Sequence, residues 1–144
     1  MGKKAQSQLT KNALLQAAKK RFARDGYLDT RFDDIAKDLS MTSGAMYHHF
    51  KNKAEIFEEV TRLCHSEIRD QLIAKADAEI ANADGLISGC MAFIELAIST
   101  KYKQIVLIDS LSILGWKKWK AFADEYSESS LREGLASLSP SLPS

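Results

Sequence analysis

Residues 30–53 read TRFDDIAKDLSMTSGAMYHHFKNK. Thr30 and Asp33 have the spacing of a capping box, in which a hydroxyl and a carboxyl each cap a backbone amide, so a helix is predicted to start at Thr30. Thr42 is the expected N-cap of a second helix over residues 43–49. Two short capped helices joined by a tight turn are typical of a helix-turn-helix.

The charge pattern indicates a polyanionic partner for the N-terminal third of the chain. No Asp or Glu occurs from Leu39 to Ala54, although 27% of all residues are charged. Residues 1–53 hold eleven Lys and Arg against five Asp and Glu, a net charge of +6, whereas residues 54–144 sum to −5. A helix that is free of carboxylates and edged by Lys, His, Ser and Thr suits a surface facing phosphates. DNA binding is therefore the leading hypothesis, and chance clustering of charge on solvated faces is the alternative.

The remaining sequence also favours helix, so we expect an all-α fold. Both prolines, Pro140 and Pro143, lie in the last five residues, and no strand-like alternation of polar and apolar residues stands out. The first helix is expected to end at Gly26 in a left-handed cap, with Tyr27 and Leu28 packing after it. The helix pair is predicted to turn Ile35, Ala36, Leu39, Met46 and Phe50 inward.

Downstream, an apolar stripe predicts one long helix that continues to about Ile80 and opens with an Asn52–Glu55 cap pair. Asn82, Asp84 and Gly85 interrupt this pattern. Further helices are expected over residues 86–99, 101–114 and 116–138, before a frayed tail. The first of them is apolar around much of its circumference, which is typical of a central helix. The chain thus divides into a helix-turn-helix domain over residues 1–53 and an incomplete helical ligand-binding and dimerisation domain over residues 54–144.

Each part of a DNA-reading surface has candidate residues in this stretch. Ser43 and His48 can bond base edges, the Ala45 methyl can meet a thymine methyl, and Gly44 lets the helix start approach closely. Tyr47, Lys51 and Lys53 suit phosphates, together with the free amides at the helix starts. Lys53 stands at the first turn of its helix, where a cation opposes the helix dipole and an outside anion would relieve the conflict. His49 suits either phosphate contact or packing.

Other classes of function find less support. Cys64 and Cys90 are expected to be reduced core residues rather than a disulfide, and His48, His49, Cys64 and His65 do not have the spacing of a metal site. No catalytic constellation or cofactor motif occurs, so an enzyme is not expected. Without a signal peptide or an apolar span, the chain is expected to be cytoplasmic, with no membrane partner. The aromatic run Trp116, Trp119 and Phe122 fits a membrane-surface helix less well than a bundle core.

Residues from about 9 to 60 resemble the DNA-binding domain of the tetracycline-repressor (TetR) family of bacterial transcriptional regulators. The resemblance rests on Phe22, Gly26, Tyr27, Thr30, Ile35, Ala36 and the run TSGAMYHHFKNK, residues 42–53. Arg31 departs from it, since members often carry a second small hydroxyl residue there, and Arg31 is expected to reach a phosphate. The full candidate set for DNA contact is Thr30, Arg31, Thr42, Ser43, Gly44, Ala45, Tyr47, His48, His49, Lys51 and Lys53.

The resemblance implies a nucleoid-associated homodimer that binds a palindromic operator in double-stranded DNA. It also implies that an unknown small-molecule inducer, bound among the C-terminal helices, releases the repressor. Residues 86–138 resemble the family's regulatory bundle more weakly. There Met91, Phe93, Tyr102 and Trp116 either line a ligand cavity or simply pack in the core.

Family members usually continue for at least two more long helices, which build a four-helix dimer interface. We therefore expect a truncated or unusually short member whose dimer is weakened or altered and whose last helices expose apolar faces. Two alternatives follow from this expectation. The chain could be a helical module that pairs with a full-length relative without binding DNA well, or a small-molecule-binding bundle with a vestigial DNA-binding head.

Overall fold

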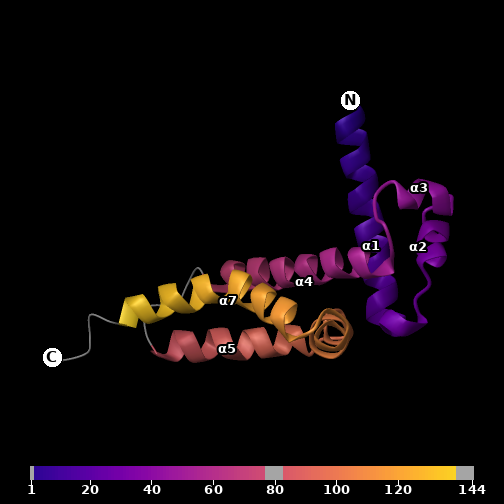
Figure 1. The fold of residues 1–144 in the computed structure, drawn as a ribbon. Helices are drawn as coiled ribbons and strands as arrows, with labels where there is room; N and C mark the ends of the chain where they lie inside the picture. Colours follow the sequence, from indigo (N-terminus) through magenta and orange to yellow (C-terminus); the bar gives the residue numbers. More distant parts are fainter. Residues whose placement is uncertain (1, 77–82, 139–144) are drawn as a thin grey trace.

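The computed structural model describes residues 2–76 and 83–138, and these form helices joined by short turns, with no strand among them (Figure 1). The predicted all-α class is confirmed. The helices are α1 (Lys3–Asp29), α2 (Phe32–Asp38), α3 (Ser43–Tyr47), α4 (Lys53–Ala76), α5 (Ala83–Ala97), the π-helical η1 (Lys103–Asp109), α6 (Ser110–Leu114) and α7 (Trp116–Leu138). None of these described helices is long and apolar enough to cross a membrane.

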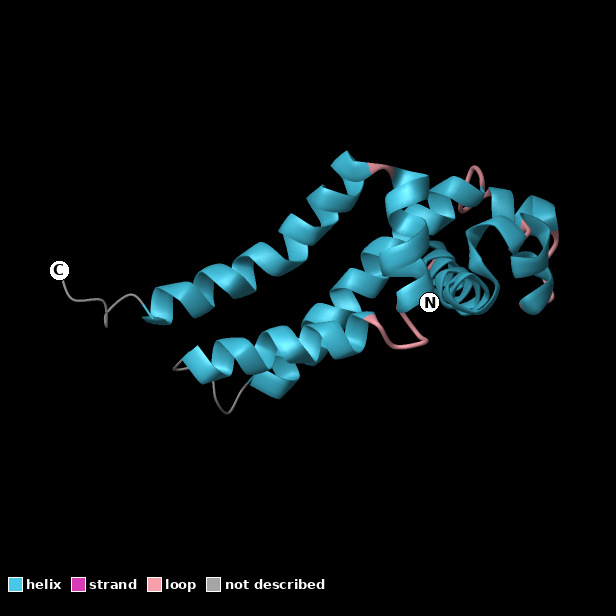
Figure 2. Cartoon of the chain, turned by 90° about the horizontal axis from the view of Figure 1, so that it is seen from below, coloured by secondary structure: helices cyan, strands magenta, loops and turns pink. Residues whose placement is uncertain are grey.

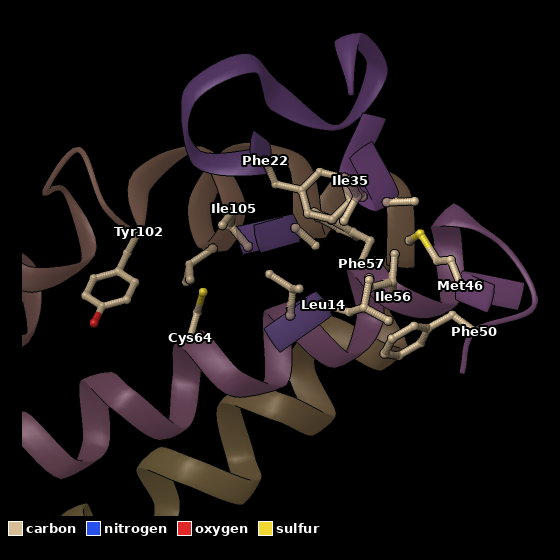
Figure 3. Packing of buried hydrophobic residues seen from close by; sticks show 14 of the residues in the cluster. Leu14, Phe22, Ile35, Met46, Phe50, Ile56, Phe57, Cys64, Tyr102 and Ile105 are labelled. Atoms are coloured by element: carbon tan, nitrogen blue, oxygen red, sulfur yellow. The ribbon is translucent and has the colours of Figure 1, made fainter. Parts of the chain in front are cut away.

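The N-terminal helices pack around one aromatic and aliphatic core with the start of α4 (Figure 3). Phe22 of α1 meets Phe57 of α4 edge to face, with 5.1 Å between the ring centroids. The inward residues of the helix pair are as predicted: Ile35, Ala36, Met46 and Phe50 are at most 1% exposed, and Leu39 packs against them. Burial of these apolar side chains holds α2 and α3 against α1 and α4.

Gly26 breaks α1 as predicted, but not in a left-handed helical cap. Its φ of 81° is positive, whereas its ψ of 169° is extended, and helical geometry resumes after the kink. A Cβ at Gly26 would lie 3.4 Å from Nε2 of Gln104 and 3.5 Å from Oδ2 of Asp109. Tyr27 packs as expected, with 4.9 Å between its ring and that of Phe57. Leu28, predicted to pack, is 82% exposed, so that prediction is wrong.

Two of the three predicted N-terminal helix caps are confirmed. Oγ1 of Thr42 accepts from the Ala45 amide at 3.1 Å, and Oδ1 of Asn52 accepts from the Glu55 amide at 2.9 Å. The capping box at Thr30 is wrong. Its hydroxyl donates to the Gly26 carbonyl at 2.7 Å, and α2 begins two residues later, at Phe32, without a side-chain cap.

α4 leaves the N-terminal helices and runs beside α5 and α7 (Figures 1 and 2). Its predicted apolar stripe is confirmed, because Ile56, Phe57, Val60, Cys64 and Ile68 are buried. At about 1.5 Å per residue, its 24 residues span roughly 36 Å. The predicted continuation to Ile80 lies outside the described residues, as does the end of the tail from residue 139.

α5 differs from the prediction in its start and in its surroundings. It begins at Ala83, so Asp84 and Gly85 lie in its first turn instead of before it. Ile87 is 62% exposed and Met91 is 53% exposed, so α5 is a peripheral helix and not a central one. The physical reason is that α5 packs mainly against α4, with a smaller contact to η1. Its apolar outer side confirms the expectation of an exposed apolar face.

The last two predicted helices are present, with a π-helical start to the first. Gly115, with φ 81°, separates α6 from α7 as expected. Phe122 is buried, but Trp116 is 61% exposed and stacks on the half-buried Trp119 at 5.4 Å. The prediction of an aromatic core therefore fails for Trp116, because the ring lies on the outer side at the start of α7.

Candidate nucleic-acid interface

α2 and α3 lie on the side of α1 that faces away from α5 and α7 (Figures 1 and 2). Met46 and Phe50 point into the core from this pair, as Figure 3 shows. Because α3 has five residues, anchoring Met46 inward turns the remaining residues of the helix toward its outer side. The helix-turn-helix therefore keeps Met46 in the core and leaves one side of α3 open to solvent.

The outer side of α3 is accessible to solvent, and Gly44 lies in the first turn of the helix. Gly44 and His48 are exposed, Tyr47 is 55% exposed, and Ser43, Ala45 and His49 are half-buried. A Cβ built at Gly44 would meet no atom of the described residues within 4 Å, and its φ lies outside the left-handed region. The fold itself does not require glycine at this position. A close approach from outside the chain would explain it.

An acid reaches this surface from α2, although the sequence from Leu39 to Ala54 contains none. Oγ of Ser43 donates to Oδ1 of Asp33 at 2.8 Å. The segment from Leu39 to Ala54 thus contains no acidic residue, but in the folded chain the carboxylate of Asp33 lies beside it. Asp33 was predicted to cap the helix that starts at Thr30. Because the turn after α2 brings α3 close, its carboxylate accepts from Ser43 of α3 instead.

The predicted phosphate contacts divide into two groups, and the first is free to bind. Arg31 and Lys51 are exposed, and their cationic groups form no ion pair with the described residues. The Tyr47 ring packs on Phe32, with 4.8 Å between centroids, and its hydroxyl has no hydrogen-bond partner in the described chain. These three side chains can each hold a phosphate oxygen without breaking an existing bond.

The second group, Lys53 and Thr30, is hydrogen-bonded within residues 2–53, which we call the head. Nζ of Lys53 donates to the carbonyls of Tyr27 at 2.8 Å and Thr30 at 3.0 Å, and lies 4.2 Å from the centre of the Tyr27 ring. Burial lowers the pKa of Lys53. The predicted conflict with the helix dipole is thus relieved by carbonyls after the α1 kink, and an outside anion is not needed. Thr30 is 1% exposed, so its side chain does not reach the surface.

Ion pairs that the sequence analysis did not single out fix how the helices of the head meet. Arg21 of α1 holds Asp38 of α2 by two hydrogen bonds, of 2.5 and 2.7 Å. The bonded guanidinium lowers the pKa of the Asp38 carboxyl. Lys11 bonds Glu59 of α4 at 3.0 Å. The spacing along the sequence, 17 and 48 residues, gives no local signal for either pair.

The four residues predicted to line a ligand cavity differ in their exposure to solvent. Met91, Phe93 and Trp116 are 53%, 38% and 61% exposed, whereas Tyr102 is 1% exposed. The Tyr102 hydroxyl donates to Oε2 of Glu67 and accepts from Nε2 of Gln71, both at 2.9 Å. Tyr102 is thus a core residue with a satisfied polar end. Cys64 and Cys90 are both free thiols, as predicted, but only Cys64 is a core residue; Cys90 is exposed, so that part of the prediction is wrong.

Comparison with known proteins finds family matches in both parts of the chain. Residues 14–60 match the family model described as "Bacterial regulatory proteins, tetR family", and residues 83–141 match "Tetracyclin repressor-like, C-terminal domain". The HTH-type transcriptional regulator TtgR of Pseudomonas putida is 32% identical over 108 residues, which cover 71% of this chain and 50% of TtgR. The Transposon Tn10 TetC protein of Escherichia coli is 28% identical over 124 residues, 81% of this chain and 59% of that protein.

A solved structure, that of a TetR-family transcriptional regulator from Pectobacterium atrosepticum, is 29% identical and superposes with a TM-score of 0.70. The match covers 87% of this chain and 69% of that one. The chain thus spans between 50% and 59% of the length of the two curated relatives.

Proposed function

The chain belongs to the tetR family of bacterial regulatory proteins, and from this premise we propose that it is a sequence-specific DNA-binding regulator of transcription that acts as a repressor. The observation that carries the proposal is the outer side of α3, where the space above Gly44 is open. The family consists of transcriptional regulators and not of enzymes. Its members bind DNA operators and small molecules, usually as dimers.

In the proposed complex, α3 enters the major groove with its N-terminal turn. Ser43, Ala45 and His48 face the base edges, and Asp33 restrains the Ser43 hydroxyl so that its oxygen is left to accept a hydrogen bond. Asp33 itself can accept from a cytosine amino group. Sequence preference therefore depends on these side chains.

Phosphates are held around α3 by the Tyr47 hydroxyl and by Arg31 and Lys51. Amides at the start of α3 add further donors, since Thr42 caps one of them and leaves others free. Lys53 keeps one ammonium hydrogen beyond its two bonds to carbonyls, and that hydrogen can reach a phosphate. We infer that Lys53 acts mainly by positioning the start of α4 against the end of α1.

A homodimer would place two copies of α3 on a palindromic site, and release by an inducer would require the ligand to favour a different spacing of these helices. α4 is the element through which that coupling would pass, because it begins in the head and packs against α5 and α7.

The test is selection of bound sequences from a random double-stranded DNA pool by the full chain, followed by fluorescence anisotropy at several salt concentrations. We expect a palindromic preference and a linear fall of log affinity with log salt. Lys51→Gln should reduce the slope by about 1 without changing the preferred sequence. His48→Ala should relax the preference and keep the slope.

Lys75→Gln is the matched control, because Lys75 is an exposed lysine near the far end of α4. It should behave as the unaltered chain does. Failure to enrich any sequence, or an equal loss of slope in the Lys75 and Lys51 variants, would contradict the proposal.

A further inference from the structure

A charged cavity lies where the head meets the rest of the chain. It is formed by α1, by α4 and by the turn between α5 and η1, and it has a volume of about 630 Å³. Sites for small molecules in proteins have volumes of about 300 to 1,000 Å³. The cavity includes none of the residues placed on DNA above.

Positive charge dominates its lining. Lys19, Lys20 and Arg24 come from α1 and Lys101 from the turn, against one carboxylate, that of Glu67. Lys19 and Lys101 neighbour Glu67, and Arg24 pairs with Asp25, so the excess positive charge rests on Lys20 and Lys101. This excess positive charge attracts anions to the cavity.

The carboxylate of Glu67 already has partners within the chain. It pairs with Nζ of Lys19, accepts from the Tyr102 hydroxyl at 2.9 Å, and lies 4.0 Å from Nζ of Lys101. Lys19 is 5% exposed, so the Lys19–Glu67 pair lies largely beneath the surface. Lys20 forms no ion pair with the described residues.

We propose that this cavity is a binding site for a small multivalent anion that carries phosphate or carboxylate groups. Lys20, Lys101 and the guanidinium of Arg24 hold the anionic groups at the rim, while the Lys19–Glu67 pair provides the polar floor. Arg24 is bonded to the neighbouring Asp25 in an exposed pair, which an anion can displace at little cost. Ala23 adds a small apolar wall.

The location couples such a site to the head. Lys20 and Arg24 belong to α1, and Lys101 precedes η1, whose Asp109 accepts from the Tyr27 amide at 2.9 Å. An anion that bridges α1 and Lys101 therefore favours one placement of the head against η1. If that placement differs from the DNA-bound one, the anion changes DNA affinity by the same factor as DNA changes anion affinity. This second step rests on the proposed function, but binding of the anion does not.

The experiment is calorimetric and NMR titration of the full, ¹⁵N-labelled chain with pyrophosphate and, separately, with citrate, in the absence of DNA. We expect saturable binding that weakens with added salt, and amide shifts centred on Ala23 and Thr100. The two probes distinguish a preference for phosphate from one for carboxylate. The variant Lys20→Gln/Lys101→Gln should bind about 2- to 30-fold more weakly, since it loses two exposed charge contacts to the anion.

The control is Lys75→Gln/Lys117→Gln, which removes the same charge from two exposed lysines outside the cavity. Circular dichroism checks that both double variants fold. The proposed site would be overturned by an equal loss of anion affinity in the two double variants, by amide shifts centred elsewhere, or by no saturable binding of either probe.

Anisotropy with DNA is measured separately on the same preparations. If the chain binds DNA but neither probe, the anion site is refuted and the proposed DNA-binding function stands. If it binds a probe but no DNA, the proposed function is refuted and the anion site stands.

Discussion

Replacing Gly44 by alanine separates what the fold needs from what DNA needs. In α3 the new Cβ meets nothing within 4 Å, and the backbone φ is not in the left-handed region, so no strain is introduced. Alanine is favoured over glycine in a helix by about 0.5 to 1 kcal/mol, because glycine loses more backbone entropy on folding. Gly44→Ala should therefore raise the melting temperature by roughly 2 to 4 °C.

The same methyl should weaken DNA binding. It projects from the first turn of α3 into the space that a phosphate or base edge would occupy in the proposed complex. Pushing the helix start outward lengthens its hydrogen bonds, and losing one charge-assisted bond costs about 1.5 to 3 kcal/mol, a factor of roughly ten or more in affinity. Anisotropy with the selected DNA measures this loss, and calorimetry measures the gain in stability.

Gly26→Ala is the matched control. There φ is 81° and the Cβ would lie 3.4 Å from Nε2 of Gln104, so the substitution should destabilise the chain by about 1 to 3 kcal/mol. Loss of stability in Gly44→Ala would refute the geometry of α3. A gain in stability with unchanged DNA affinity would show that the start of α3 does not touch DNA.

Three further predictions test single contacts. Lys53→Met should lower the free energy of unfolding by about 1 to 3 kcal/mol in urea titrations, because it leaves the Tyr27 and Thr30 carbonyls without their donor; unchanged stability would contradict the contact. Asp33→Asn should tighten non-specific DNA binding about two- to fivefold at low salt, since it removes a negative charge beside the start of α3, and weaker binding would count against this orientation. Burial lowers the pKa of His65 to about 4, and its Nε2 has no hydrogen-bond partner in the described chain. The folded state thus keeps the neutral ring, so stability is full above about pH 6.5 and falls toward pH 4 by up to about 1.4 kcal/mol per unit; His65→Leu should lose this part of the dependence in urea midpoints.

Local signals in the sequence predicted well. The Thr42 cap and the Asn52–Glu55 pair each join atoms three residues apart, and both are present. The apolar stripe of α4 and the break at Gly115 follow from spacing along one helix and from the backbone freedom of glycine. The family resemblance of residues 42–53 belongs to the same class of short-range information.

Contacts between elements were predicted poorly. Lys53 was interpreted from its own helix, whereas its acceptors lie 23 and 26 residues away. α5 was judged central from its own composition, but burial of a helix depends on how many neighbours cover it. The failure at Thr30 is different, because it is local: its hydroxyl donates at 2.7 Å to the Gly26 carbonyl four residues earlier, a bond that competes with capping.

Patterns within about four residues predicted the helices, the turn between α2 and α3, and the polar and cationic residues around α3. The folded arrangement then sets which of those groups are free. It gives Lys53 acceptors that are distant in the sequence, brings Asp33 to Ser43, and leaves Arg31 and Lys51 open. It also assembled a cationic cavity from three separate segments. Hydrogen bonds and charges act through space over a few ångströms, and the folded chain alone sets which residues lie that close.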